Sequence, residues 1–154
     1  MKMIEKIVNP EKLRHFPPGG GKIELYWIYT TGKAGEEFFR KLKEGKFIAA
    51  KCKKCGRRYF PPRIYCEFDF SETEFYEISG EGCVEAFTIA KLDVNEEPIE
   101  EVIALIKLDN TDGRILHVIR EAKDVCIGMR VKPVLKKAEE MQGNICDILY
   151  YKPA

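Results

Sequence analysis

The sequence contains no long hydrophobic run and no excess of charge of one sign. No segment approaches the ~18 consecutive apolar residues that a membrane-spanning helix requires. The N-terminal stretch lacks the apolar run of a secretion signal. The 26 basic and 25 acidic residues leave a net charge of +1, whereas dedicated binders of nucleic acid or anionic membranes usually carry a strong basic excess. We therefore expect a cytoplasmic protein without a membrane partner.

Histidine is scarce as well, which leaves little material for acid–base catalysis. Only His15 and His117 are present, and neither stands in a recognisable nucleophile–base pattern. His117 lies between Leu116 and Val118 in an apolar stretch, which favours a structural role in a strand. We expect a protein with no catalytic residues, and therefore not an enzyme in its own right.

The six cysteines are the most informative residues present. Because a secretion signal is lacking, a reducing compartment and metal binding are favoured over disulfides. Cys52 and Cys55 form a Cys-x-x-Cys pair. Cys66 follows, and Asp69 stands where a second such pair would end. Two such turns on facing hairpins are typical of a zinc ribbon, in which four ligands surround a tetrahedral metal. The remaining cysteines fall in or beside apolar strands and are expected to be small buried side chains: Cys83, Cys126 and Cys146.

Basic residues surround this motif: Lys51, Lys53, Lys54, Arg57, Arg58 and Arg63. Two interpretations stay open. In the first, these cations keep the surface solvated and stabilise negatively charged sulfur. In the second, they form an anion site for a phosphorylated cofactor or for nucleic acid.

The residues ahead of the motif predict an N-terminal arm. Residues 10–16 are able to form a short helix, and 17–22 are a proline- and glycine-rich linker. Residues 23–30 are β-branched and aromatic, which predicts a strand or extended arm. Eight residues cannot bury themselves, so this segment must pack on another element or on a partner chain. We therefore include a homo-oligomer among the expected assemblies.

Residues 34–44 form the clearest helix of the sequence. Glu36 and Glu37 are expected in its first turn, where negative charge suits the helix dipole, and Gly45 is expected to end it. One side of this helix is apolar: Phe38, Phe39 and Leu42. We expect that face to dock on the zinc ribbon or on the domain that follows. A strand over 47–50 then leads to the first cysteine.

From Ser79 onward, short strand-like segments alternate with turns. The five candidates are 80–92, 101–109, 113–120, 130–139 and 144–152. Residues 110–113 predict a hairpin turn between the second and third, and 121–126 predict one helical turn between the third and fourth. Five strands with an insertion of this kind after the third follow the order of an OB-fold barrel.

The fold class expected from these observations is mainly β with an N-terminal helical arm. A rubredoxin-like zinc ribbon is followed by a five-stranded OB-fold barrel. The predicted divisions are 1–46 for the arm and helix, 47–78 for the ribbon and 79–154 for the barrel. A ribbon of this size has little core, so a metal would supply much of its folding free energy.

The order of motifs resembles a known family, the two-domain zinc-ribbon/OB-fold proteins associated with acyl-CoA thiolases. The matching segments are Tyr29–Gly35, Phe39 with Leu42 and Gly45, Cys52 with Cys55 and Gly56, Phe60–Arg63, Cys66, Gly82 with Val84, and Ile127–Val131. The resemblance covers about residues 29–150, and it is specific because these motifs occur in a fixed order.

The resemblance implies an accessory role. Such a protein is expected to be a non-catalytic scaffold that partners a thiolase-type enzyme and also a hydroxymethylglutaryl-CoA synthase, with acyl-CoA as ligand. Cationic groups for the phosphates and apolar groups for the acyl chain suggest a groove formed by Trp27, Phe38, Phe39 and Arg63.

One position departs from the family pattern. Asp69 occupies the fourth metal position, where the family usually has cysteine. Aspartate can bind zinc through oxygen, so a structural zinc held by three cysteines and one aspartate is expected. The alternative is a ribbon without metal, kept folded by packing of Phe68 and Phe70.

Single-stranded nucleic acid is the rival ligand, because zinc ribbons and OB-folds both serve that function. The basic residues around Cys52 favour it. The balanced net charge and the acidic segment 93–101 disfavour it.

Overall fold

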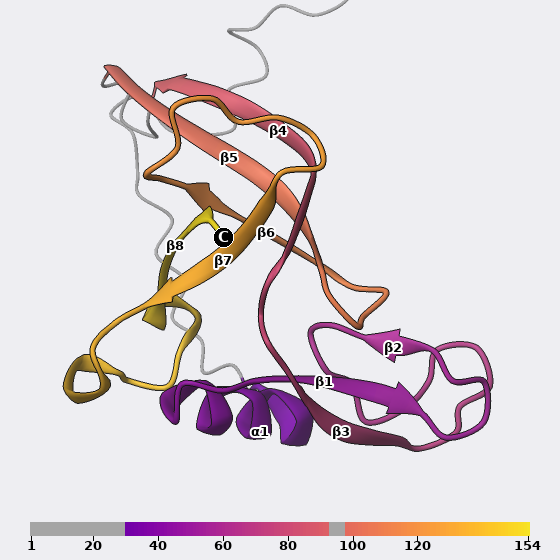
Figure 1. Ribbon diagram of the computed structural model, residues 1–154. Coiled ribbons are helices and arrows are strands. Elements are labelled where there is room, and N and C mark those ends of the chain that lie inside the picture. The colour runs from indigo at the N-terminus through magenta and orange to yellow at the C-terminus, as the bar shows by residue number, and fades with distance from the viewer. Residues whose placement is uncertain (1–29, 93–97) are drawn as a thin grey trace, which may run out of the picture. The chain divides into compact units, whose positions relative to one another are not determined.

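The computed structural model of the protein describes residues 30–92 and 98–154 and is mainly β, as predicted (Figure 1). The elements are α1 (Gly32–Lys43), β1 (Phe47–Cys52), β2 (Arg58–Tyr59), β3 (Thr73–Ile78), β4 (Gly82–Leu92), β5 (Pro98–Leu108), β6 (Arg114–Ile119), β7 (Arg130–Leu135), β8 (Ile148–Pro153) and two short 3-10 helices, η1 (Ala138–Glu140) and η2 (Ile145–Asp147). No helix among the described residues is long and apolar enough to cross a membrane.

Part of the predicted arm cannot be compared with the structure. The helix expected over 10–16, the linker over 17–22 and the strand over 23–30, apart from Thr30, lie outside the described residues. Trp27 lies there too.

Helix α1 confirms the predicted helix but begins two residues earlier, at Gly32. Glu36 and Glu37 therefore lie beyond the first turn, and the expectation that they would occupy it is wrong. Basic residues do occupy the last turn: Arg40, Lys41 and Lys43. Gly45 follows the helix with φ of +77°, a conformation that glycine adopts without steric cost.

The apolar face of α1 packs into the same core as the ribbon and the barrel. Ala34, Phe38 and Leu42 are buried, and Leu42 is fully enclosed. The ring of Phe38 meets that of Phe60 edge-on, with centroids 5.6 Å apart. The core extends from this helix through Phe47 and other residues of β1 into the barrel strands. The expectation that this helix docks on its neighbours is confirmed.

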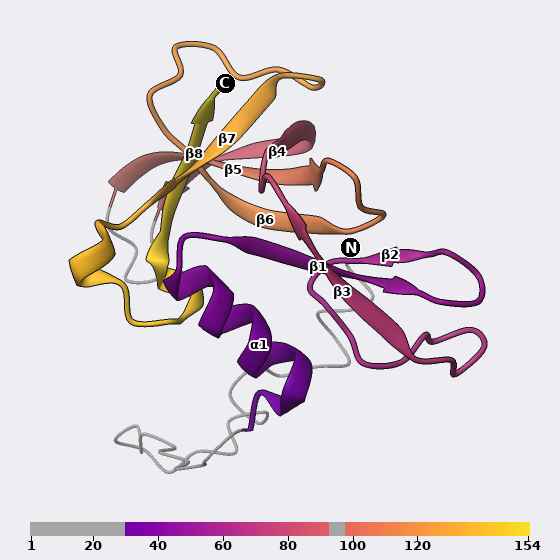
Figure 2. The same cartoon turned by 60° about the horizontal axis from the view of Figure 1, so that its bottom comes forward.

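The ribbon is a three-stranded antiparallel sheet in the order β2-β1-β3 (Figure 2). β1 pairs with β3 from Phe47 opposite Ile78 to Cys52 opposite Thr73. On its other edge, β1 pairs with β2. The first four residues of β1 are buried, which fixes the strand and so fixes Cys52 at its end.

The barrel is closed, with the strand order β4-β5-β6-β8-β7. β4 pairs with both β5 and β7, which closes the sheet. β6 and β8 run parallel, with Ile119 opposite Tyr151. This is the five-stranded order predicted for the OB-fold.

The last two barrel strands are shorter than predicted, and one predicted turn is wrong. Residues 136–139 and 144–147 are not strand; 3-10 turns occupy part of each segment. The chain over 121–126 makes bends instead of a helical turn. Glu121 has φ of +58°, which a right-handed helix does not allow. Its carboxylate instead accepts hydrogen bonds from Tyr150 and Lys152.

The ribbon and the barrel meet at the β5–β6 turn. The Arg58 amide donates to the Asp112 carboxylate at 3.0 Å, and the Asp112 amide donates back to the Arg58 carbonyl at 2.9 Å. A Cβ added at Gly113 would lie 2.4 Å from the Phe60 carbonyl oxygen, so only glycine permits this approach. Residues 31–154 form one compact unit. The domain divisions at 46/47 and 78/79 stay predictions.

Two cysteines outside the ribbon differ from expectation. Cys83 is half-buried, but Cys126 and Cys146 are exposed. Cys126 lies in the irregular β6–β7 connection and Cys146 in η2, rather than in buried strands. The prediction that both would be buried is wrong.

Candidate metal centre

The first knuckle is formed where β1 ends at Cys52. The Cys52 amide donates to the Arg57 carbonyl at 2.8 Å, and the Gly56 amide donates to the Cys52 carbonyl at 3.1 Å. Gly56 closes the turn with φ of +75°. The amides of Lys54 and Cys55 both point at the Cys52 sulfur from 3.3 Å. These two contacts hold the Cys52 sulfur in place within the turn.

The second knuckle repeats this backbone pattern from Cys66. Its amide donates to the Ser71 carbonyl at 2.9 Å, and the Phe70 amide donates to the Cys66 carbonyl at 3.1 Å. Phe70 has φ of +56°. In the matched turns, Asp69 thus stands where the first knuckle has Cys55, and Phe70 where it has Gly56.

Phe68 and Phe70 do not fill the interior of the ribbon. They are 58% and 79% exposed, so the alternative in which their packing keeps a metal-free ribbon folded is wrong. Phe70 also adopts the left-handed backbone conformation, which costs a residue with a Cβ about 1–2 kcal/mol. The ribbon therefore gains little hydrophobic core from these rings. Its stability depends more on the four side chains between the knuckles, Cys52, Cys55, Cys66 and Asp69.

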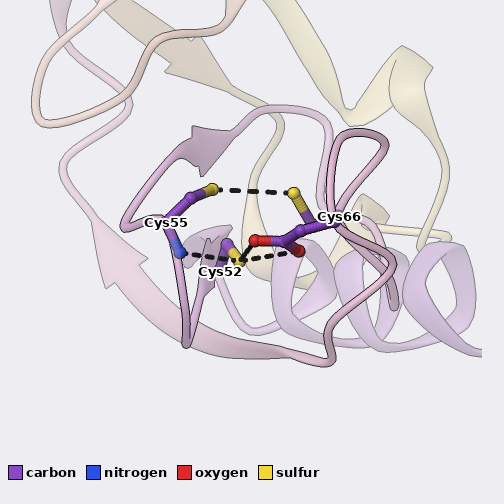
Figure 3. Close-up of side chains that lie close together, drawn as sticks. Cys52, Cys55 and Cys66 are labelled. Atoms are coloured by element: carbon purple, nitrogen blue, oxygen red, sulfur yellow. Dashed lines mark hydrogen bonds between the residues drawn. The ribbon is translucent and has the colours of Figure 1, made fainter.

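Cys52, Cys55, Cys66 and Asp69 come together as the spacing predicted. Their ligand atoms all lie within 4.8 Å of one another. The Cys55 and Cys66 sulfurs are 3.6 Å apart, and the Cys52 sulfur is 3.6 Å from both Asp69 oxygens (Figure 3). Tetrahedral zinc with Zn–S bonds of ~2.3 Å separates its sulfurs by about 3.8 Å. Both the spacing and the donor atoms fit a zinc ion.

The protonation of this cluster also suits a cation. The Ser71 amide donates to Asp69 at 3.0 Å and is the main cause that lowers the pKa of this carboxyl to about 2. Burial opposes ionisation of Cys66, but hydrogen bonds led by the Tyr59 hydroxyl outweigh it and lower the pKa of that thiol.

Cys55 behaves in the opposite way. The Arg57 amide favours its thiolate, but burial and the neighbouring Cys52 and Cys66 thiols raise its pKa to about 11. Neighbouring sulfurs resist ionising together, and a divalent cation supplies the charge that lets all of them do so. With four protein ligands such a site is closed and has no place for a reactive water. Its contribution is structural.

The carboxylate of Asp69 is expected to be a working ligand. Asp69→Ala should weaken zinc affinity by at least ~10-fold, because even groups outside the ligand shell contribute 10–100-fold. Asp69→Cys should keep one zinc per chain and release it more slowly to a chelator, because thiolate is the softer ligand. Metal analysis during chelator dialysis measures both. Asp124→Ala, which removes an exposed carboxylate from the barrel, is the control. Full wild-type retention by Asp69→Ala would show that the carboxylate is not a ligand.

Three of the four residues predicted for an acyl-CoA groove lie in the described part of the chain: Phe38, Phe39 and Arg63. Phe38 is 4% exposed and belongs to the core, and Phe39 is partly buried against it. Arg63 is exposed, pairs with Glu67 at 2.5 Å and lies over the Tyr59 ring. Binding of acyl-CoA by this set stays a prediction.

A cavity of about 240 Å³ lies beside the group formed by Cys52, Cys55, Cys66 and Asp69, which we call the metal cluster. The sequence indicated only some of its lining residues. Its lining residues come from both the ribbon and the β5–β6 turn: Arg57, Arg58, Tyr59, Phe60, Arg63, Glu67, Asp112 and Gly113. The run of basic residues indicated an anion site as one interpretation. Asp112 and Gly113 carried no signal, because they are distant in sequence.

His117 occupies β6 as expected and is half-buried. Its Nδ1 accepts a hydrogen bond from the Val118 amide at 2.9 Å, and its ring lies 5.6 Å from that of Tyr151. Burial lowers the pKa of this imidazole, so the neutral form is favoured.

Comparison with known proteins agrees with this geometry. A sequence profile of the ChsH2 rubredoxin-like zinc ribbon domain matches residues 39–74, which include all four candidate ligands. A DUF35 domain-containing scaffold protein from Methanocaldococcus jannaschii is 36% identical over 99 residues, which cover 60% of this chain and 70% of that protein.

Two solved structures share the fold. A DUF35-family protein of unknown function from Sulfolobus solfataricus has 37% identity and a TM-score of 0.58, over 68% of this chain and 79% of that one. The Ltp2–ChsH2(DUF35) aldolase has a TM-score of 0.61 over 82% and 98% of the two chains. At 19% identity, this second likeness shows the fold alone.

Proposed function

The chain belongs to the DUF35 family, and from that premise we propose that it is a non-catalytic accessory subunit. It binds a thiolase-type enzyme, and in a larger assembly a hydroxymethylglutaryl-CoA synthase, and it handles their acyl-CoA. Zinc is its structural cofactor, held by Cys52, Cys55, Cys66 and Asp69. The scaffold name of the Methanocaldococcus relative supports the accessory role. The inclusion of a DUF35 chain in an aldolase supports a place beside an enzyme.

One observation of this chain carries the proposal. The second knuckle presents three exposed aromatic side chains, Tyr65, Phe68 and Phe70, which are 58%, 58% and 79% exposed. Aromatic residues are enriched at the centres of protein interfaces. The closed metal cluster holds the loop that carries them, so their positions are set before a partner arrives. A preformed loop with exposed aromatic side chains suits a scaffold protein better than a catalyst.

The test is complex formation with a thiolase-type enzyme from the same organism. Wild-type protein is expected to co-elute with that enzyme in size-exclusion chromatography. Phe68→Ser combined with Phe70→Ser should weaken the complex by ~30-fold or more, since truncating one hot-spot aromatic costs about 2 kcal/mol. Leu116→Ser is the matched control, because Leu116 is an exposed apolar residue of the barrel. Failure of the wild-type chain to bind any thiolase-type enzyme would reject the proposed partner.

Single-stranded nucleic acid stays the second candidate ligand. The observation in its favour is Arg57, whose guanidinium lies 3.6 Å from the centre of the exposed Phe68 ring. Cations beside exposed rings are a common feature of single-strand binding surfaces. Retention on an oligonucleotide that falls steeply with salt would support it.

A further inference from the structure

Two arginines of the ribbon differ from every other arginine in the described part of the chain. Five of the seven arginines there form ion pairs with carboxylates: Arg40, Arg63, Arg114, Arg120 and Arg130. For Arg57 and Arg58, residues 30–92 and 98–154 provide no carboxylate within ion-pair distance. Both of these residues line the cavity of about 240 Å³ beside the metal cluster, which we call the arginine cavity.

The acidic residues of the arginine cavity already have partners. Glu67 pairs with Arg63 at 2.5 Å. Asp112 uses its carboxylate to accept the Arg58 backbone amide at 3.0 Å, while the Arg58 guanidinium forms no ion pair with it. Arg57, Arg58 and Arg63 supply three positive charges to the cavity lining, and Glu67 and Asp112 supply two negative ones. The lining therefore keeps a net charge of +1, which favours an incoming anion.

The Arg57 guanidinium is held in place without being neutralised. It stacks over the Phe68 ring at 3.6 Å, a contact that orients a cation and leaves its full charge. Arg63, which is paired with Glu67, also lies over a ring, 5.5 Å from the centre of Tyr59. Tyr59 is fixed in turn, because its hydroxyl lies 3.1 Å from the Cys66 sulfur. Through this contact with Cys66, the metal cluster holds Tyr59, a lining residue of the cavity, in position.

The size and the chemistry of the cavity indicate what it binds. Pockets that enclose whole small molecules measure about 300–1,000 Å³, so about 240 Å³ suits one end of a ligand whose remainder lies outside. Guanidinium groups match phosphate with paired hydrogen bonds. We propose that the arginine cavity binds a phosphate group of a phosphorylated small molecule through Arg57 and Arg58. The choice of coenzyme A as that molecule rests on the proposed function.

Calorimetric titration with coenzyme A, dephospho-coenzyme A and pantetheine tests this site. Wild-type protein is expected to bind coenzyme A more tightly than pantetheine, which lacks every phosphate. Arg57→Gln combined with Arg58→Gln should weaken coenzyme A binding by at least ~10-fold, the effect of losing one charge-assisted hydrogen bond, and leave pantetheine binding unchanged. If dephospho-coenzyme A binds more weakly than coenzyme A, the cavity binds the 3′-phosphate, which is the group that dephospho-coenzyme A lacks. If the two bind equally tightly, the cavity binds the diphosphate.

Lys53→Gln combined with Lys54→Gln is the matched control, because it removes two positive charges from the same knuckle outside the cavity. An unchanged zinc content shows that the arginine variant is folded, and Arg57→Lys with Arg58→Lys should bind at an intermediate level because only the fork geometry is lost. Equal affinity of wild type and arginine variant for coenzyme A would overturn the site. Binding of a single-stranded oligonucleotide without binding of coenzyme A would overturn it as well. Binding to the thiolase-type enzyme is measured for the same arginine variant. If wild type and variant both bind the enzyme but do not differ in affinity for coenzyme A, the phosphate site is rejected and the proposed function is not.

Discussion

Replacing Cys66 with alanine is expected to release the metal and to destabilise the ribbon more than any other single change there. Cys66 is 1% exposed, and its sulfur lies 3.6 Å from that of Cys55. Structural zinc contributes about 10–16 kcal/mol in small zinc-finger peptides, whereas whole domains are stable by only 5–15 kcal/mol. Because the outward-facing Phe68 and Phe70 add little core, we expect a loss on the order of 5 kcal/mol.

Metal analysis and thermal unfolding measure this effect. Wild-type protein should hold one zinc per chain and lose its high-temperature transition when a strong chelator is added. Cys66→Ala should have no bound zinc and behave as the chelated wild type, with or without the chelator. Cys126→Ala, which removes an exposed cysteine from the barrel, should change neither quantity. One zinc per chain in Cys66→Ala would contradict the assignment of the cluster.

The barrel was predictable because each of its strands carries its own signal. Apolar, β-branched segments between turn residues predicted five strands, and their number and order sufficed for the OB-fold. The errors occur where a distant residue decides the local conformation. Glu121 adopts a left-handed backbone conformation while its side chain binds Tyr150 and Lys152, some 30 positions along the chain. A prediction made from neighbouring residues does not include such a partner.

The metal cluster was predictable for a different reason, since ligand spacing within a knuckle is a local property. Cys52 and Cys55 share one turn, and Cys66 and Asp69 share another. The arginine cavity has no such local pattern, because Asp112 and Gly113 reach it from the β5–β6 turn. The equivalence of Phe70 with Gly56 was hidden as well, since phenylalanine gives no indication of a left-handed turn.

A substitution at a second site, Asp147, is also expected to destabilise the protein strongly, and nothing in the sequence indicated this site. Asp147 in η2 is fully buried, yet its carboxylate accepts hydrogen bonds from the backbone amides of Gln142, Gly143 and Asn144 at 2.6–3.1 Å. Lys136 lies 3.5 Å away. Burial opposes ionisation of Asp147, but the amides outweigh it and lower the pKa of this carboxyl. The carboxylate therefore organises the whole β7–β8 connection.

Asp147→Asn is accordingly expected to destabilise the protein by about 3 kcal/mol, because the new NH2 group faces amide donors in a buried site. The pH dependence of this loss of stability shows whether the charge of Asp147 is its cause. The folded pKa lies below the unfolded value of about 4, so the contribution of Asp147 is complete above that pH and is lost as pH falls through the folded pKa. Urea unfolding between pH 7 and pH 3 should show a gap between wild type and variant that narrows toward acid. Asp124→Asn, at an exposed position, should show no gap, and a gap for Asp147→Asn that stays constant with pH would exclude the charge as its origin.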